Sequence, residues 1–148
     1  MKYEEIDSYF TDSESVLEIL PICSEQFTRI DEIGGILRNR GFSTPVEIEA
    51  LLKELNGINI FLTPILGVAT TAKTENEDRE YHERKMMLEK EGAKVVDAVL
   101  NREASFAISN YRRVRNVIEA YISVVNTLIM SSQSLLKNSE RERQNVVS

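Results

Sequence analysis

A chain of 148 residues with 42% hydrophobic and 28% charged residues has the composition of one globular domain, and its six glycines and three prolines are few for a turn-rich β-fold. The net charge of −6 is uneven, because residues 1–90 carry ten Lys or Arg against eighteen Asp or Glu, whereas residues 91–148 carry eight against six. This acidic average argues against non-specific DNA binding by the whole surface but permits a local basic patch.

Cysteine content and hydropathy indicate the expected surroundings of the chain. Its single cysteine, Cys23, cannot form an intramolecular disulfide, and no charged-then-apolar leader opens the sequence, so we expect an intracellular, cytoplasmic protein. A membrane span needs about 18 or more apolar residues, and the longest candidates, 58–69 and 117–130, are interrupted by polar residues or proline. We therefore expect that the chain does not cross a membrane.

Residues 1–41 predict two or three short helices. Residues 2–9 are typical of a short helix, and Asp12 or Ser13 caps a second segment that Pro21 closes or kinks. Pro21 also suits the first position of a further helix, which ends at Gly41. That helix places on one face the apolar residues Ile22, Phe27, Ile30, Ile33 and Ile36 or Leu37.

The clearest helix start lies at residues 44–47. Thr44 offers a hydroxyl cap, Pro45 takes the first helical position, and Glu47 is the third residue after the cap, which together form a capping box. A long helix over about 45–90 begins there, and Pro64 is expected to kink it. Its apolar residues recur in steps of three and four: Ile48, Leu51, Leu55, Ile58, Leu62, Ile65, Ala69 and Ala72.

The last fifty residues hold the strongest periodicity and predict one helix over 104–144, followed by a frayed tail, 145–148. The seam has heptad spacing: Ala104, Ala107, Tyr111, Val114, Ile118, Tyr121, Val125, Leu128, Ser132 and Leu135. Flanking isoleucines and leucines make the apolar stripe wider than a two-helix contact needs. We therefore expect a homo-oligomer with an interface formed by Ile118, Tyr121, Ile122, Val125, Leu128 and Ile129.

These elements predict an all-α protein: a long antiparallel helical hairpin, coiled-coil-like, over residues 44–144, preceded by the two or three shorter helices of residues 1–41. The chain must turn near residues 91–103, where Gly92 permits the turn and residues 94–100 supply a short helix across it.

Cations and aromatic rings gather around this turn. The cations are Lys85, Lys90, Lys94, Arg102, Arg112, Arg113 and Arg115, and the rings are Tyr81, Phe106 and Tyr111. Such a set could follow a phosphate backbone and stack unpaired bases, which predicts binding of single-stranded DNA. The alternative is that the cations are solubilising charges paired with Glu83, Glu89, Glu91 and Glu103.

The runs "ERKMMLEKEGAKVVDAVLN" and "YRRVRNVIEAYISVVNTLIMSSQSLLKN" give residues 80–138 a resemblance to the C-terminal hairpin of small helical bacteriophage proteins related to the UvsY-type recombination mediators. The resemblance implies a protein of the bacterial host's cytoplasm that oligomerises, binds single-stranded DNA and helps a recombinase to displace single-strand-binding protein. The DNA contacts that it implies are Lys85, Lys90, Lys94, Arg112, Arg113 and Arg115.

Catalytic patterns are missing from the sequence. His82 is the only histidine, so a histidine-based metal cluster or a Ser-His-Asp triad is not available within one chain. Cys23 lacks an accompanying base and is expected to be a small core residue, and no glycine-rich phosphate loop is present. We expect no enzyme, cofactor or metal. The other open function is a structural or protein-interaction module, such as a virion component, a scaffold or an acidic inhibitor protein.

Overall fold

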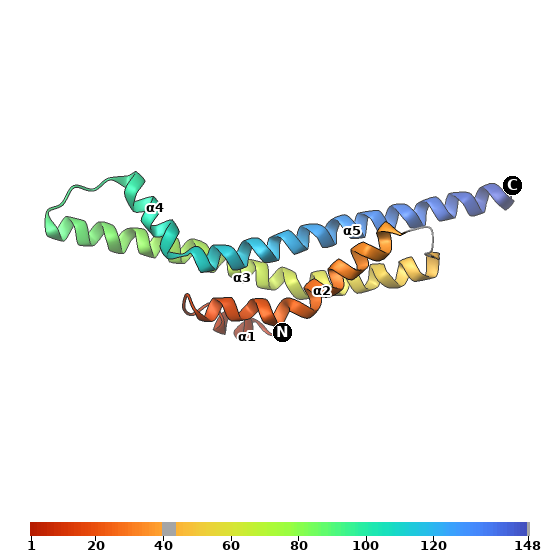
Figure 1. Cartoon of the computed structure of the whole chain (residues 1–148), viewed down its shortest axis with the longest axis horizontal. Helices are drawn as coiled ribbons and strands as arrows, with labels where there is room; N and C mark the ends of the chain where they lie inside the picture. The colour runs from red at the N-terminus through yellow and green to blue at the C-terminus, as the bar shows by residue number, and fades with distance from the viewer. Residues whose placement is uncertain (40–43, 148) are drawn as a thin grey trace. The chain divides into compact units, whose positions relative to one another are not determined.

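In the computed structural model, the described residues, 1–39 and 44–147, contain helices and no strand. The elements in chain order are α1 (Tyr3–Ser8), the 3-10 helix η1 (Ser15–Glu18), α2 (Ile19–Arg38), α3 (Pro45–Glu91), α4 (Asp97–Ala107) and α5 (Ser109–Val147). Figure 1 labels α1 to α5. The predicted all-α class is therefore confirmed.

The helices fall into two compact units, and the two longest helices contribute to both. Unit 1 consists of Met1–Leu20 and Pro64–Val117, and unit 2 consists of Pro21–Thr63 and Ile118–Ser148. α3 thus gives its first part to unit 2 and its second part to unit 1. This division cuts across the two segments, 1–41 and 44–144, that the sequence suggested.

The start of α3 has the predicted capping box. The backbone N–H of Glu47 donates to the Thr44 hydroxyl at 3.3 Å, and the backbone N–H of Thr44 donates to the Glu47 carboxylate at 3.3 Å. Two donors that the first helical turn leaves without backbone partners are satisfied in this way. From Pro45 the helix continues without interruption through Pro64 to Glu91.

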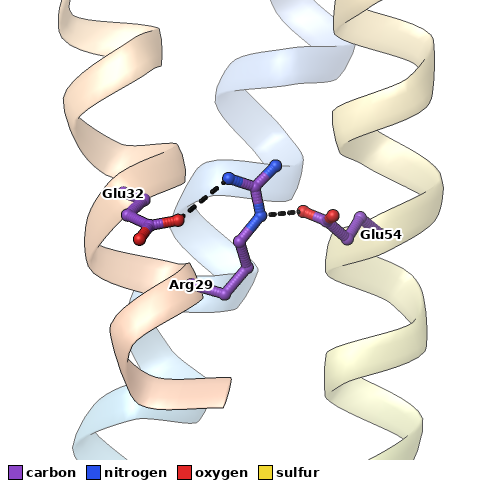
Figure 2. Close-up of polar contacts among 3 residues, drawn as sticks. All are labelled: Arg29, Glu32 and Glu54. Carbon is purple, nitrogen blue, oxygen red and sulfur yellow. Dashed lines mark hydrogen bonds and ion pairs between the residues drawn. The ribbon is translucent and has the colours of Figure 1, made fainter. Parts of the chain in front are cut away.

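Unit 2 is built from α2, the first part of α3 and most of α5. The Phe27 ring of α2 stacks on Tyr121 of α5, with centroids 4.1 Å apart. Figure 2 shows Arg29 of α2 donating from Nε to Glu54 of α3 at 2.5 Å and from Nη1 to Glu32 at 3.1 Å. The buried residues are Cys23, Phe27, Ile30, Ile33, Leu37, Ile48, Leu51, Leu55, Ile58, Leu62, Ile118, Val125 and Ser132.

Unit 1 holds α1 and η1 against the second part of α3, α4 and the start of α5. The Asp12 carboxylate accepts the backbone N–H groups of Glu14 and Ser15 before η1, and the bond from Ser15 is the main cause that lowers the pKa of Asp12. Asn110 of α5 donates to the Ser13 carbonyl at 2.9 Å. The core contains Ile6, Phe10, Val16, Ile19, Ile65, Ala69, Ala72, Leu100, Ala104, Ile108, Tyr111 and Val114.

The predicted apolar seam of α3 is confirmed, because all eight of its residues are buried. The start of α2 differs from the sequence expectation. The helix begins at Ile19, so Pro21 lies inside its first turn, where a missing N–H removes no hydrogen bond. Of the two residues that the sequence left open for the apolar face, Leu37 is buried and Ile36 is exposed. The expected helix end at Gly41 lies outside the described residues.

The expected single helix over 104–144 is wrong at its start, because the helix breaks at Ile108, between α4 and α5. Ile108 leaves the helical conformation with φ −101° and ψ 21°. At the other end α5 continues to Val147, over residues that we expected to fray. The preceding run of Glu, Arg and Gln consists of good helix formers, which accounts for this extension.

By length and composition alone, α3 could cross a membrane, since its most apolar 18-residue window has a mean hydropathy of 1.3. Of that window, 33% is buried inside the protein. One such helix is weak support for a span, because the core helices of globular proteins have the same composition. The absence of a membrane span stays a prediction.

The seam of α3 gives a stability prediction. Leu55→Ala should lower the free energy of unfolding by about 2 to 5 kcal/mol, because Leu55 is fully buried and its truncation leaves a cavity. The matched control is Ile60→Ala on the same helix, where the side chain is 75% exposed and the change should stay within about 0.5 kcal/mol. Urea denaturation followed by circular dichroism measures both, and equal losses would contradict this packing.

The capping box gives a second prediction. Thr44→Ala should cost about 1 kcal/mol of stability, because the backbone N–H of Glu47 loses its side-chain acceptor. Thr44→Ser keeps a hydroxyl at the same place and should restore most of the loss. Thermal unfolding of the two variants beside the unchanged protein tests this, and an alanine variant as stable as the serine variant would show that the cap contributes nothing.

Candidate nucleic-acid interface

The turn predicted from the sequence lies in unit 1, between α3 and α4. The backbone N–H of Gly92 donates to the Glu89 carbonyl at 3.2 Å, and that of Ala93 donates to the Leu88 carbonyl at 3.0 Å. This pair of bonds is the Schellman motif, which requires a residue with positive φ after the helix, and Gly92 has φ +70°. Gly92 therefore ends α3, as expected.

Polar contacts tie α4 to α3 beyond this turn. The Tyr81 hydroxyl donates to the Asp97 carboxylate at 2.6 Å, and Arg84 lies 3.6 Å from Glu103 and 3.3 Å from Glu80. The Asp97 bond is the main cause that raises the pKa of Tyr81. We name the region from residue 79 to residue 107, which contains these contacts, the tip.

Charges on the tip balance. Residues 79–103 contain six cations and six carboxylates, namely Arg79, Arg84, Lys85, Lys90, Lys94 and Arg102 against Glu80, Glu83, Glu89, Glu91, Asp97 and Glu103. Residues 104–117 carry three arginines and no acid. Within residues 79–117 the positive excess therefore lies near the start of α5.

Five of the seven candidate cations have no ion pair among the described residues: Lys85, Lys90, Lys94, Arg102 and Arg113. Lys85 is half-buried and the other four are exposed. Of the four glutamates that the alternative interpretation invoked, only Glu103 forms an ion pair in the described part of the chain, and its partner is Arg84. Pairing with those glutamates therefore does not account for the five cations.

Arg112 has a structural task. Its Nη2 donates to the Ser105 carbonyl at 2.8 Å and to the Ser105 hydroxyl, and it lies 4.0 Å from Glu77. Ser105 is in the last turn of α4, where carbonyls lack helical partners, so Arg112 satisfies a group that the break at Ile108 leaves open. Arg115 is half-buried and donates to Asn116 at 3.2 Å. Neither guanidinium is as available for phosphate as Arg113.

The three candidate rings have different environments. Tyr111 is only 4% exposed, so its ring lies in the core of unit 1, and its assignment to base stacking is wrong. Tyr81 is half-buried and engaged with Asp97. Phe106 on α4 is 82% exposed and is the one ring of the three that solvent reaches freely. Arg102 precedes it by one turn and is also exposed.

Three of the six expected oligomer residues serve unit 2 itself. Ile118 and Val125 are fully buried, and Tyr121 stacks on Phe27. Ile122, Leu128 and Ile129 are half-buried. Ile118 and Val125 therefore cannot form an exposed interface, and a role of the other three in an oligomer stays a prediction.

The tip also carries a groove that the sequence patterns did not predict. It has a volume of about 320 Å³ and is lined by Arg84, Met87, Leu88, Glu91, Lys94, Val96, Val99, Leu100 and Glu103. The lining residues 84, 87, 88 and 91 of α3 have the spacing of one helix face, and so do 96, 99, 100 and 103 at α4. This spacing is the only sequence signal of the groove. Each face is only two turns long, so the sequence does not reveal that the two faces form a groove until the geometry of the turn between α3 and α4 is known.

Potential metal ligands do not gather in the described part of the chain. No three His, Cys, Asp or Glu side chains there are placed to hold a metal ion. His82 is exposed and its ring meets the Tyr81 ring edge-on, with centroids 5.5 Å apart. Cys23 is buried, as expected for a core residue, and burial raises the pKa of its thiol to about 11.

Comparison with known proteins gives no relative: no family description, no curated protein and no solved structure matches this chain.

The bond between Tyr81 and Asp97 gives a prediction for α4. Tyr81→Phe should speed hydrogen–deuterium exchange of the α4 amides, because the first turn of α4 loses its tie to α3. Since folding raises the pKa of Tyr81, this stabilisation is present below about pH 10 and is lost as the pH rises through the folded pKa. Tyr3→Phe, at an exposed tyrosine of α1, is the control. Unchanged α4 exchange in Tyr81→Phe would contradict the role of this bond.

Proposed function

We propose that this chain is a non-catalytic accessory protein that binds single-stranded DNA through α4 and the start of α5. The observation that carries the proposal is the exposure of Phe106, together with exposed Arg102 one turn before it. A free aromatic face beside a guanidinium offers stacking for an unpaired base and a contact for its phosphate. Arg113 extends the basic surface, with Lys90 and Lys94 as further cations on the tip.

The proposed partner set follows from the resemblance of residues 80–138 to UvsY-type recombination mediators. A mediator acts beside a recombinase or a single-strand-binding protein in the cytoplasm of a bacterial host cell, and we propose the same setting for this phage-type chain. The balanced charge of residues 79–103 supports modest affinity, because few phosphates would be neutralised.

We further propose that α3 with α4 and α5 forms the long antiparallel hairpin, with a coiled-coil-like seam over residues 44–144. Within unit 1, Glu77 of α3 lies near Arg112 of α5, and Arg84, further along α3, lies near Glu103 of α4. Later residues of α3 therefore contact earlier residues of α4 and α5. Within unit 2, Pro45 at the start of α3 lines a groove with residues 133–146 of α5. Both observations support opposite chain directions.

A second function, a protein-interaction module such as a virion component, scaffold or acidic inhibitor protein, is favoured by the groove on the tip. The groove presents Met87, Val96 and Val99 as exposed apolar side chains, and the flexible methionine can adapt to a protein partner. Under this function single-stranded DNA would not bind, so one titration separates the two.

The test is a fluorescence anisotropy titration with a labelled strand of about 30 nucleotides in about 50 mM salt. Phe106→Ala should weaken binding by about 5- to 150-fold, because stacking contributes about 1 to 3 kcal/mol per base. Phe106→Tyr keeps an aromatic face and should bind nearly as well. Because the Phe106 side chain is exposed, neither change should alter helix content.

Salt dependence tests the cations in the same assay. Three or four phosphate contacts predict a slope of roughly −2 to −3 for log K against log salt, at about −0.7 per contact. The double change Arg102→Ala and Arg113→Ala removes two phosphate contacts and should make this slope less steep by about 1.4. The controls Lys53→Ala and Lys137→Ala remove exposed cations of unit 2 and should leave it unchanged. Absence of binding at about 10 μM protein would refute the DNA-binding function and leave the interaction module.

A further inference from the structure

The groove on the tip lies between two diverging helix faces. Its walls are the last two turns of α3 and the first two turns of α4, and the turn at Gly92 joins them at one end. Leu100 is buried and Leu88 is half-buried, so they form its apolar floor. Two helices that contact each other along one side leave an apolar groove between them. Further helices fill such a groove in a helical bundle.

The rim of the groove is apolar and exposed. Met87 is 61% exposed, and Val96 and Val99 are also exposed. All three side chains line the same groove, so this exposed apolar surface is gathered in one place. Gathered apolar surface of this kind marks an interaction site rather than the scattered exposure of ordinary surfaces.

Charges at the two ends of the groove decide which partner fits. At one end Arg84 pairs with Glu103, and at the other end Glu91 and Lys94 lie near the turn without an ion pair among the described residues. Each end therefore carries one cation and one carboxylate, and residues 79–103 as a whole are neutral. A strongly acidic or basic partner would gain nothing from such a rim, whereas a surface with both signs can match a copy of itself.

We infer that the groove is a two-fold interface that a second copy of this chain fills with its own tip. The α3 and α4 ends of both copies then form a four-helix arrangement, in which Met87 and Val99 of each copy are covered by the other. Two-fold pairing of one patch with itself is the commonest way in which identical chains associate. The interface differs from the one expected on α5, whose central residues are already buried within unit 2.

The pairing is independent of DNA binding, because Arg102 and Phe106 do not line the groove. A dimer would nevertheless present two such α4 surfaces to one strand, which raises the effective affinity when both engage. Pairing is measured on the protein alone, and DNA binding is measured with a labelled strand. Failure of one proposal can therefore be distinguished from failure of the other.

The first experiment measures mass by multi-angle light scattering over about 1 to 100 μM protein. The unchanged protein should approach twice 16.9 kDa, while Met87→Asp and Val99→Asp should each stay near 16.9 kDa. Each change enters a two-fold interface twice, so the dissociation constant should rise by at least about 100-fold. Because both side chains are exposed in the single chain, helix content should be unaffected.

Matched controls place the same charge on exposed apolar residues elsewhere. Ile60→Asp on α3 and Val124→Asp on α5 lie in unit 2 and should pair like the unchanged protein. The inference is overturned if the unchanged protein stays at 16.9 kDa throughout, which would assign the groove to a different partner. It is also overturned if folded Met87→Asp and Val99→Asp still pair.

Charge exchange at the end near the turn supplies a second measurement. Lys94→Glu or Glu91→Lys alone leaves two like charges at that end in both copies, and either should weaken pairing at low salt. The double exchange, Glu91→Lys with Lys94→Glu, restores one charge of each sign and should recover it. A double variant that pairs no better than the two single variants would show that this end lies outside the interface.

Discussion

The need of α3 to bury one apolar stripe governs the packing of its neighbours as far as Ala72. From Ile48 to Ala72 its buried residues follow steps of three and four, and the described helices of both units contribute buried residues beside them. Burial of such side chains is the main favourable term in folding, at roughly 1.5 to 3 kcal/mol for each large one. In unit 2 this stripe holds α2 and α5, and ion pairs such as that between Arg29 and Glu54 add little at a half-exposed position.

Beyond Ala72 the stripe ends, and polar contacts replace it. Tyr81 with Asp97 and Arg84 with Glu103 hold α4 to α3, and Arg112 satisfies the open end of α4. Polar contacts of this type orient α4 relative to α3 but bury little apolar surface. Apolar side chains of the tip such as Met87, Val99 and Phe106 therefore stay exposed, which is why both the proposed DNA surface and the proposed pairing surface lie there.

The candidate site could be predicted only in part. The turn at Gly92 and the capping box at Thr44 follow from local chemistry, since each depends on residues within one or two turns. Periodicity could not say that Tyr111 faces the core of its own unit, because a heptad position serves a neighbour from the same chain as well as one from another chain. The roles of Arg112 depended on a helix break that no residue type announces.

Sequence alone determined the helical class, the extent of α3 and the residues of its seam, because hydrophobic spacing, a proline at the first helical position and a glycine after the last turn act locally. Tertiary structure alone decided which neighbour covers each stripe. It buried Ile118 and Val125 of α5 within unit 2, broke the helix at Ile108 and left the groove between α3 and α4 uncovered. The physical reason is that the hydrophobic effect is non-directional, so any apolar neighbour can bury the stripe. The pattern on one helix therefore shows which face is buried but does not show which element buries it.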